Sequence, residues 1–225
     1  MTARPVKFRL KTQARCYMSE SLDSKKCILA VAARLFAKLG LDKTSTREIA
    51  KESKANISLI SYYFGGKEGL YKEVMRNFAE ELRAHVNEKI LSRPKGEITK
   101  EIFKNEISMV VEMLIFFHRN YPDVFQILER EKITGMKYSK EVHEEIFFPL
   151  AKEFLQMFQD AQKAKVVSPD INPTLYFTVL TEGVSGFFAV KDCPTLVGEE
   201  CLSIHKDADQ LIKQVTEIYT QGVLL

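Results

Sequence analysis

A glycine- and lysine-containing segment at residues 65–69 is the first candidate for chemistry, because the backbone amides of glycine-rich loops can bind phosphate. The segment lacks the glycine five residues before Gly66 that such a loop needs, and Glu68 stands where Ser or Thr belongs. No nucleophile motif is present, and no metal-ligand spacing links the four histidines, His85, His118, His143 and His205. The sequence therefore argues against an enzyme and predicts neither a metal site nor a cofactor.

The four cysteines are too few and too scattered for a disulfide framework or a zinc site. They stand at Cys16, Cys27, Cys193 and Cys201. We expect reduced structural thiols. The alternative is a redox role, for which only Cys193 and Cys201 are near each other in sequence.

Charge divides unevenly along the 225 residues, although the net charge is only +3. Residues 1–92 hold 18 Lys and Arg against 10 Asp and Glu, a balance of +8, whereas residues 93–225 hold 15 against 20, a balance of −5. A basic first part with an acidic remainder indicates a polyanionic partner for the first part only.

Residues 24–66 contain the signals of three short helices. Apolar residues from Ile28 to Leu39 repeat at helical spacing, and Gly40 follows as a stop. Ser45 and Glu48 have the spacing of a capping box at the start of a second helix. Asn56 can cap a third helix, which ends before Gly65 and Gly66. Lys67 then opens a long helical pattern to about residue 91, with one apolar stripe.

The second and third helices have the form of a helix-turn-helix, in which a short second helix fits the major groove of DNA. Five residues would pack the pair together: Ile49, Ala50, Ala55, Ile60 and Phe64. The outer face keeps the polar residues Asn56, Ser58, Ser61 and Tyr62. We therefore expect this face to contact double-stranded DNA. A plain helical hairpin with the same caps is the alternative.

The stretch TSTREIAKESKANISLISYYFGGKEGLY, Thr44 to Tyr71, resembles the TetR family of bacterial regulators. The resemblance covers roughly residues 24–72, and its most specific part is the aromatic pair followed by Phe64 and, after two small residues, Lys67 and Glu68. It implies that Ser45, Thr46, Tyr63 and Lys67 meet phosphates and that Arg47 reaches a base or phosphate. It also implies that five residues face bases or the groove: Ile57, Ser58, Leu59, Ser61 and Tyr62.

Two positions depart from the family pattern. The turn between the two helices carries Lys54 where the family usually has Gly, so the turn either avoids positive φ or tolerates it at some cost. Position 57 is often polar or basic in the family and is Ile57 here. Periodicity alone would place Ile57 inside, three residues before Ile60, whereas the family pattern places it outside, which we favour.

We predict an all-α chain with a flexible basic arm at 1–23, a helix-turn-helix domain at 24–69, a connecting helix at 70–92 and a ligand-binding and dimerisation domain at 93–225. The arm could contact DNA phosphates, and Met18 is an alternative translation start. The segment 93–96, Arg-Pro-Lys-Gly, marks the main boundary. Later helices are expected at about 98–119, 121–132, 139–164, 172–190 and 206–222, with a kink at Pro149.

The resemblance implies a homodimer on a palindromic operator, with the last two helices forming the interface. The residues that would supply it are Tyr176, Phe177, Val179, Leu180, Val184, Phe187 and Phe188, with Leu211, Ile212, Val215, Ile218 and Tyr219. The alternative is that these residues form an ordinary intramolecular core.

An aromatic- and methionine-rich region between residues 103 and 158 can line an adaptable apolar cavity, or can simply fill the core. The residues we select for an effector pocket are Met109, Met113, Phe116, Phe117, Phe125, Phe147, Phe154 and Tyr176. The polar candidates are His118, which could instead cap a helix end beside Asn120, and Glu182, which could instead face a dimer partner.

The sequence thus predicts a DNA-binding regulator, a repressor released from DNA by a small, largely apolar molecule. The alternative is a DNA-bound structural or cell-cycle factor of the same fold without an effector, and a cavity larger than about 300 Å³ favours the first. No apolar run is long enough to span a membrane, and we expect the protein in the cytoplasm.

Overall fold

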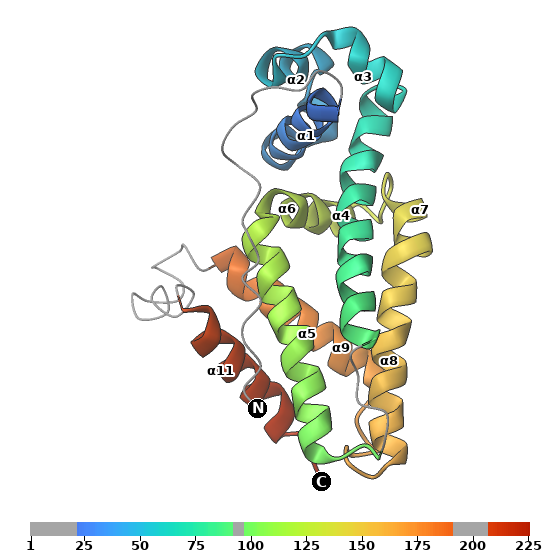
Figure 1. The fold of residues 1–225 in the computed structure, drawn as a ribbon, viewed down its shortest axis with the longest axis vertical. Coiled ribbons are helices and arrows are strands. Elements are labelled where there is room, and N and C mark those ends of the chain that lie inside the picture. The colour runs from blue at the N-terminus through green and yellow to red at the C-terminus, as the bar shows by residue number, and fades with distance from the viewer. Residues whose placement is uncertain (1–21, 92–96, 191–206) are drawn as a thin grey trace.

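Helices make up most of residues 22–91, 97–190 and 207–225, the parts of the chain that the computed structural model describes (Figure 1). Within these ranges the one β-type pairing is an isolated bridge between Val167 and Leu224. The all-α prediction is therefore confirmed. The predicted arm and the boundary at 93–96 lie largely or wholly outside the described residues.

The three N-terminal helices are α1 (Leu22–Lys43), α2 (Thr46–Ser53) and α3 (Ile57–Phe64). Gly40 interrupts α1 with φ 80° and ψ 168°, a conformation that favours glycine. The predicted stop at Gly40 is thus a break in the helical backbone, after which a short last turn runs to Lys43. The broken end brings the chain round to α2.

Helix α4 (Lys67–Leu91) runs from the tip of the molecule into its larger part (Figure 1). Its first turn packs tightly against the end of α3. A Cβ atom at Gly69 would lie 1.8 Å from the carbonyl oxygen of Phe64, so glycine is the residue that this approach permits. The stripe on α4 begins with Leu70, Val74 and Phe78, all buried.

The larger part contains α5 (Lys100–Asn120), α6 (Pro122–Ile133), α7 (Lys140–Val142), η1 (His143–Phe147), α8 (Phe148–Lys163), α9 (Pro173–Val190) and α11 (Ala208–Gln221). In this part of the chain, each predicted helix end agrees with an observed one within two residues. The pattern of apolar residues therefore located these helices well.

The predicted kink at Pro149 takes the form of a π-helical turn. Proline has no N–H, and its ring clashes with a carbonyl one turn earlier in a regular helix. The chain accommodates this in η1, where the N–H of Phe148 bonds to the carbonyl of His143, five residues back. Residues 140–163 thus form one helical rod whose register changes just before Pro149.

Two hydrophobic cores hold the described residues together. The first core contains residues of the four helices α1, α2, α3 and α4, together with α6, η1 and the end of α5. It includes Phe36, Met75 and Phe117. The second joins α5, α8, α9 and α11 around Phe103 and Phe158. Because the first core contains residues of α1 to α3 as well as of α6, the N-terminal helices are packed onto the rest of the chain.

Cys27 on α1 is disulfide-bonded. The expectation of a reduced thiol is therefore wrong for this residue. The other three cysteines, Cys16, Cys193 and Cys201, lie outside the described residues. None of the helices in the described ranges is both long and apolar enough to cross a membrane.

Candidate functional site

Side-chain caps fix where α2 and α3 begin. The hydroxyl of Ser45 accepts a hydrogen bond from the N–H of Glu48 over 3.1 Å. The side chain of Asn56 accepts from the N–H of Ser58 over 3.0 Å and from its hydroxyl over 2.8 Å. Both predicted caps are confirmed. Each contributes on the order of 1 kcal/mol and sets the first turn that faces outward.

The turn between the two helices adopts a left-handed conformation at Lys54, with φ 53° and ψ 28°. Its N–H bonds back to the last carbonyls of α2, at Ala50 and Lys51. Of the two alternatives for this departure from the family pattern, the lysine therefore tolerates positive φ. The strain is the cost of holding α3 at a fixed angle to α2.

The exposed face of α3 consists of Ile57, Ser58, Ser61 and Tyr62, whose spacing places them on one side of the helix. Ile57 is 43% exposed and Tyr62 is 80% exposed. The opposite side is buried through Ile60 and Phe64. Ile57 thus faces outward, as the family pattern indicated and periodicity alone did not. An exposed isoleucine can contact the methyl groups of thymine.

The remaining residues selected for DNA contact surround this face. Ser45, Arg47 and Asn56 are exposed, and Thr46, Leu59, Tyr63 and Lys67 are half-buried. Leu59 and Tyr63 also pack against the first core. The ammonium of Lys67 donates to the carbonyl of Asp42 over 3.3 Å, a contact that joins the start of α4 to the last turn of α1.

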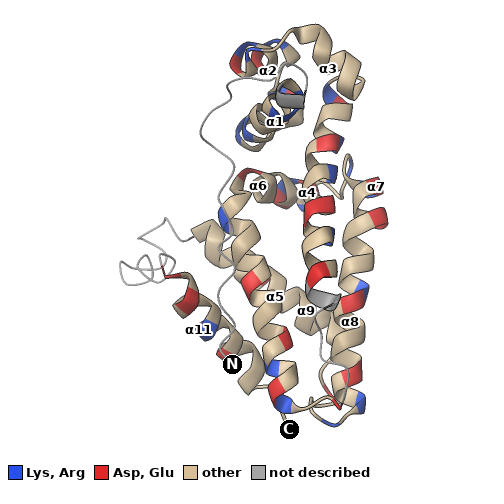
Figure 2. Cartoon of the chain, viewed as in Figure 1, with Lys and Arg blue, Asp and Glu red and all other residues tan. Residues whose placement is uncertain are grey.

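Helix α3 carries no charged side chain, so its exposed face is neutral (Figure 2). Positive side chains flank it from other elements, with Arg47 and Lys51 on α2, Lys54 in the turn and Lys67 at the start of α4. Neutral and apolar groups suit base edges, and surrounding cations suit phosphates. The arrangement matches what a groove-binding helix requires.

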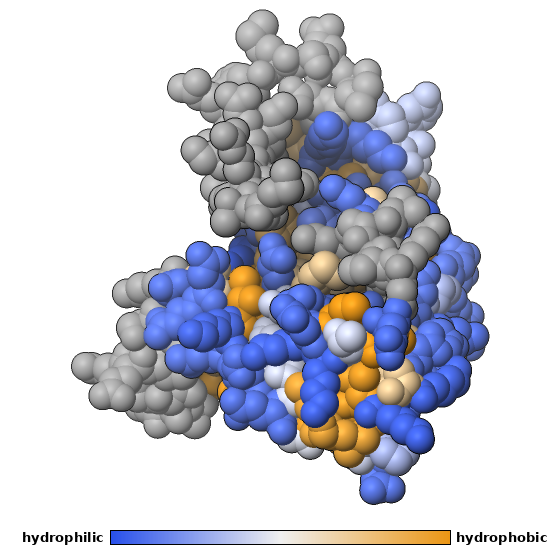
Figure 3. Space-filling model, turned by 60° about the horizontal axis from the view of Figure 1, so that its bottom comes forward, coloured by the Kyte–Doolittle hydropathy of each residue, from blue (hydrophilic) through white to orange (hydrophobic). Residues whose placement is uncertain are grey.

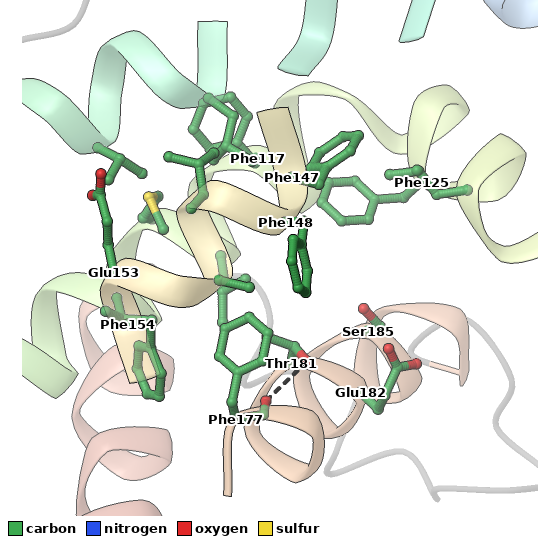
Figure 4. Close-up of a pocket in the computed structure, with 18 of the residues that line it drawn as sticks. Phe117, Phe125, Phe147, Phe148, Glu153, Phe154, Phe177, Thr181, Glu182 and Ser185 are labelled. Atoms are coloured by element: carbon green, nitrogen blue, oxygen red, sulfur yellow. Dashed lines mark hydrogen bonds between the residues drawn. The ribbon is translucent and has the colours of Figure 1, made fainter. Parts of the chain in front are cut away.

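A second site lies in the larger part, where α4, α5, α6, η1, α8 and α9 enclose a pocket of about 340 Å³ (Figure 4). Its walls are mostly apolar, and ten of the 24 lining residues are phenylalanine or methionine. Phe148 and Phe177 point toward the same space, and Glu182 and Ser185 of α9 lie at one side of it. The volume falls in the range of small-molecule sites, which begins near 300 Å³.

Seven of the ten residues selected for a ligand line this pocket. They are Met109, Met113, Phe117, Phe125, Phe147, Phe154 and Glu182. Phe116 lies elsewhere, stacked on His85 with ring centroids 5.6 Å apart. Tyr176 is buried in the second core, where its hydroxyl donates to the carbonyl of Tyr219 over 2.7 Å.

His118 lies behind the pocket wall and neither lines it nor caps the end of α5. Its buried ring stacks on Phe125 and Phe188, with centroids 3.5 and 4.9 Å away. Its Nε2 lies 3.1 Å from the hydroxyl of Ser185, which does line the pocket. Burial, with the nearby charge of Lys132, lowers the pKa of His118 to about 4, so the ring is neutral at neutral pH.

Among the described residues, the one basic side chain in the lining of the pocket is that of Lys132, whose ammonium donates to Glu182 over 2.6 Å and to Glu129 over 2.9 Å. Burial opposes its charge, but these two carboxylates outweigh burial and raise the pKa of Lys132. Glu182 therefore has a partner within the protomer, on α6.

Three consecutive residues of α6 connect the pocket to the DNA-binding part. Lys132 lines the pocket. The guanidinium of Arg130 donates to two carbonyls at the broken end of α1, Phe36 over 2.9 Å and Lys38 over 3.3 Å. Glu131, only 3% exposed, accepts from the hydroxyl of Tyr71 on α4. A displacement of this turn of α6 thus reaches α1 and α4 directly.

Several residues of this second site escaped the sequence analysis, namely Lys132, His143, Phe177, Thr181 and Ser185. Phe177 was assigned to a subunit interface because of its helix. His143 carried no usable signal, because it lies among the charged residues Lys140, Glu141, Glu144 and Glu145. The others are brought to the pocket by long-range packing alone.

Within the described ranges no group of three or more His, Cys, Asp or Glu side chains could hold a metal ion. Fold and sites together define an all-helical protein with a helix-turn-helix at one end and a ligand-sized pocket in the part behind it.

Comparison with known proteins agrees with this class. Residues 28–74 match the family model described as bacterial regulatory proteins, tetR family. QacR, a transcriptional regulator of Staphylococcus aureus, is 30% identical over 129 residues, which are 54% of the chain and 68% of QacR. The dual regulator CecR of Shigella flexneri is 28% identical over 136 residues, and the match spans only 60% of the length of CecR.

A crystal structure of a HlyIIR mutant protein has the same fold, with a TM-score of 0.64 at 21% identity, over 86% of this chain and 93% of that one. The chain belongs to the tetR family of bacterial regulatory proteins.

Proposed function

We propose that this protein is a repressor that binds a palindromic DNA operator as a homodimer and leaves it when a small, largely apolar molecule enters the pocket. The observation that carries the proposal is the turn of α6 at residues 130–132, which contacts the pocket through Lys132 and the DNA-binding part through Arg130 and Glu131. A site that can sense a ligand and a site suited to DNA are thus joined by one rigid element.

The roles of the DNA-facing residues follow from their exposure. Ile57, Ser58, Ser61 and Tyr62 would read base edges in the major groove, because they form the outer face of α3. The surrounding hydroxyl and basic groups, Ser45, Thr46, Arg47, Tyr63 and Lys67, would bind phosphates and set the register. Asn56 and Leu59 would support the N-terminal end of this face.

A homodimer is the expected form because one short helix reads too few bases, and paired helices read half-sites about one helical turn or more apart. Leu175 and Val179 on α9 and Ile218 on α11 are 63%, 50% and 70% exposed. Hydrophobic surface is exposed at the end of the molecule opposite α2 and α3 (Figure 3). Tyr176, Leu180, Val184 and Leu211, also selected for the interface, are buried within the protomer.

Release would follow from differential binding to two conformers. A ligand can shift the equilibrium between two conformers only by the difference between its binding free energies for them. A molecule that occupies the pocket beside Lys132 would favour a position of α6 that moves α1 and α4. In the dimer, this shift changes the spacing of the two α3 helices, so that they no longer fit adjacent grooves.

The pocket also weighs against the alternative, a structural or cell-cycle factor without an effector. Such a protein has no need of a ligand-sized pocket, and dense packing would make its core more stable. The cavity of about 340 Å³ exceeds the 300 Å³ at which small-molecule sites begin, which favours the ligand-released regulator.

The test is footprinting on the DNA upstream of the protein's own gene, combined with transcription from that DNA in a purified system. We expect protection of an inverted repeat and a lower transcript yield when the protein is added. The variant Tyr62→Ala, folded but altered on the reading face, serves as the matched control and should lose the footprint. Absence of protection at low salt would contradict operator binding, and a rise in transcript would contradict repression.

A further inference from the structure

The charged side chains at the pocket are already engaged within the chain or exposed to solvent. Lys132 is held between Glu129 and Glu182, and Glu106 also interacts within the chain. Glu153 is exposed and lies at the opposite side of the pocket from Glu182 (Figure 4). The lining therefore offers no spare ammonium to an anion and no spare buried carboxylate to a cation.

One polar atom at this site lacks a partner. The Nδ1 atom of His143 is buried and makes no hydrogen bond within the described part of the chain, and the residue lines the pocket. A buried nitrogen without a hydrogen bond costs on the order of 1–3 kcal/mol. Burial, with the charge of Lys132, lowers the pKa of His143, so its imidazole is neutral at neutral pH.

The position of His143 is set by the π-helical turn. His143 begins η1, where the chain changes helical register before Pro149, and its ring lies 5.0 Å from that of Phe147. π-turns inside helices are frequent at functional sites, because the extra residue redirects side chains. The ring is therefore held by the backbone beside Phe147 in the lining of the pocket.

We propose that the effector is an uncharged, mainly aromatic or aliphatic alcohol whose hydroxyl group bonds to Nδ1 of His143 while its hydrophobic body contacts Phe147, Phe148 and Phe177. A hydroxyl group fits either tautomer of the neutral imidazole, since it both donates and accepts. The proposal rests on the proposed effector-binding function.

Charged molecules of the same size are disfavoured by the same groups. An anion would have to approach Lys132 past Glu182 and Glu129, and a cation would meet the ammonium of Lys132 itself. Either ion would also lose its hydration in an apolar cavity without gaining a free counter-ion, which is costly. An alcohol loses far less hydration and recovers a hydrogen bond.

The experiment compares four probes with one naphthalene skeleton: naphthalenemethanol, naphthoate, naphthylmethylammonium and methylnaphthalene. Binding to the full chain at neutral pH is followed by ligand fluorescence. We expect naphthalenemethanol to bind at least about tenfold more tightly than either ion, and about fivefold more tightly than methylnaphthalene. Tighter binding of naphthoate or naphthylmethylammonium would overturn the proposal.

The variant His143→Phe keeps a ring of similar size and removes the nitrogen. We expect it to bind naphthalenemethanol and methylnaphthalene equally, and unchanged binding of methylnaphthalene shows that the pocket is intact. His85→Phe, a histidine on α4 outside the pocket lining, should keep the fivefold preference for the alcohol. If His143→Phe also keeps it, the assignment of His143 is wrong while the pocket stands. If none of the four probes binds, the proposed effector function fails as well.

Discussion

The hydroxyl of Tyr71 on α4 donates to the carboxylate of Glu131 on α6 over 2.9 Å. The second oxygen of that carboxylate accepts from the N–H groups of Tyr138 and Ser139 and from the hydroxyl of Ser139. Burial and this carboxylate raise the pKa of Tyr71. One buried anion thus ties α4, α6 and the segment before α7 together between the two sites.

Replacing Tyr71 with phenylalanine tests this link. The variant Tyr71→Phe keeps the ring that packs edge-on against Phe36 and removes one donor to a buried carboxylate. We expect it to lower the free energy of unfolding by about 1.5–3 kcal/mol, since a hydrogen bond to a charged group is lost. Urea unfolding at fixed protein concentration measures the change. The control is Tyr62→Phe, at an exposed position, which should leave stability unaltered; an equal effect of both variants would contradict the link.

The left-handed turn at Lys54 predicts a stabilising substitution. Because glycine adopts φ 53° without the Cβ penalty, Lys54→Gly should raise the free energy of unfolding by about 0.5–1 kcal/mol after the greater flexibility of the unfolded chain is counted. The matched control is Lys51→Gly inside α2, which should cost about 1 kcal/mol. Thermal unfolding distinguishes the two, and destabilisation by Lys54→Gly would contradict the observed backbone.

Acid should destabilise the protein through His118. Its pKa is about 4 when folded and 6.5 ordinarily, so the unfolded chain binds more protons between these values. The stabilising contribution is complete above pH 6.5 and is lost as the pH falls toward 4. At about pH 5 the free energy of unfolding has fallen by about 2 kcal/mol. Urea unfolding of His118→Phe should show a smaller loss of stability over this window, because the variant lacks the His118 imidazole. Some loss should remain, because groups such as His143 titrate in both proteins. Parallel pH profiles would contradict the assignment.

Two variants separate base reading from phosphate binding. Tyr62→Ala should reduce the preference for the operator over unrelated DNA, because Tyr62 lies on the exposed face of α3. Lys67→Ala should weaken binding to both DNAs alike and reduce the salt slope by about one phosphate contact. Titrations at several salt concentrations measure both effects. An unchanged slope for Lys67→Ala would show that Lys67 meets no phosphate.

Local signals in the sequence predicted the helices and the helix-turn-helix. Ser45 and Asn56 act as caps and Gly40 as a stop because these residues satisfy or break the backbone within a few positions of themselves. Ile57 shows the limit of this reasoning, since periodicity and family pattern disagreed and only its exposure in the folded chain decided between them.

The pocket was predicted in part, because its chemistry depends on distant pairings. Glu182 was selected, but its partner Lys132 lies 50 residues earlier. His118 was expected to meet a ligand or cap a helix, and stacking on Phe125 and Phe188 keeps it behind the wall instead. Spacing along a helix identifies a face but not the element that will cover it.

Selection of bound sequences from a random duplex library tests the central claim, that two copies of this chain bind an operator, most directly. The account predicts enrichment of an inverted repeat with half-site centres about one helical turn or more apart, and sedimentation of that DNA with an even number of chains. Enrichment of no sequence, or of a single half-site bound by one chain, would contradict the account.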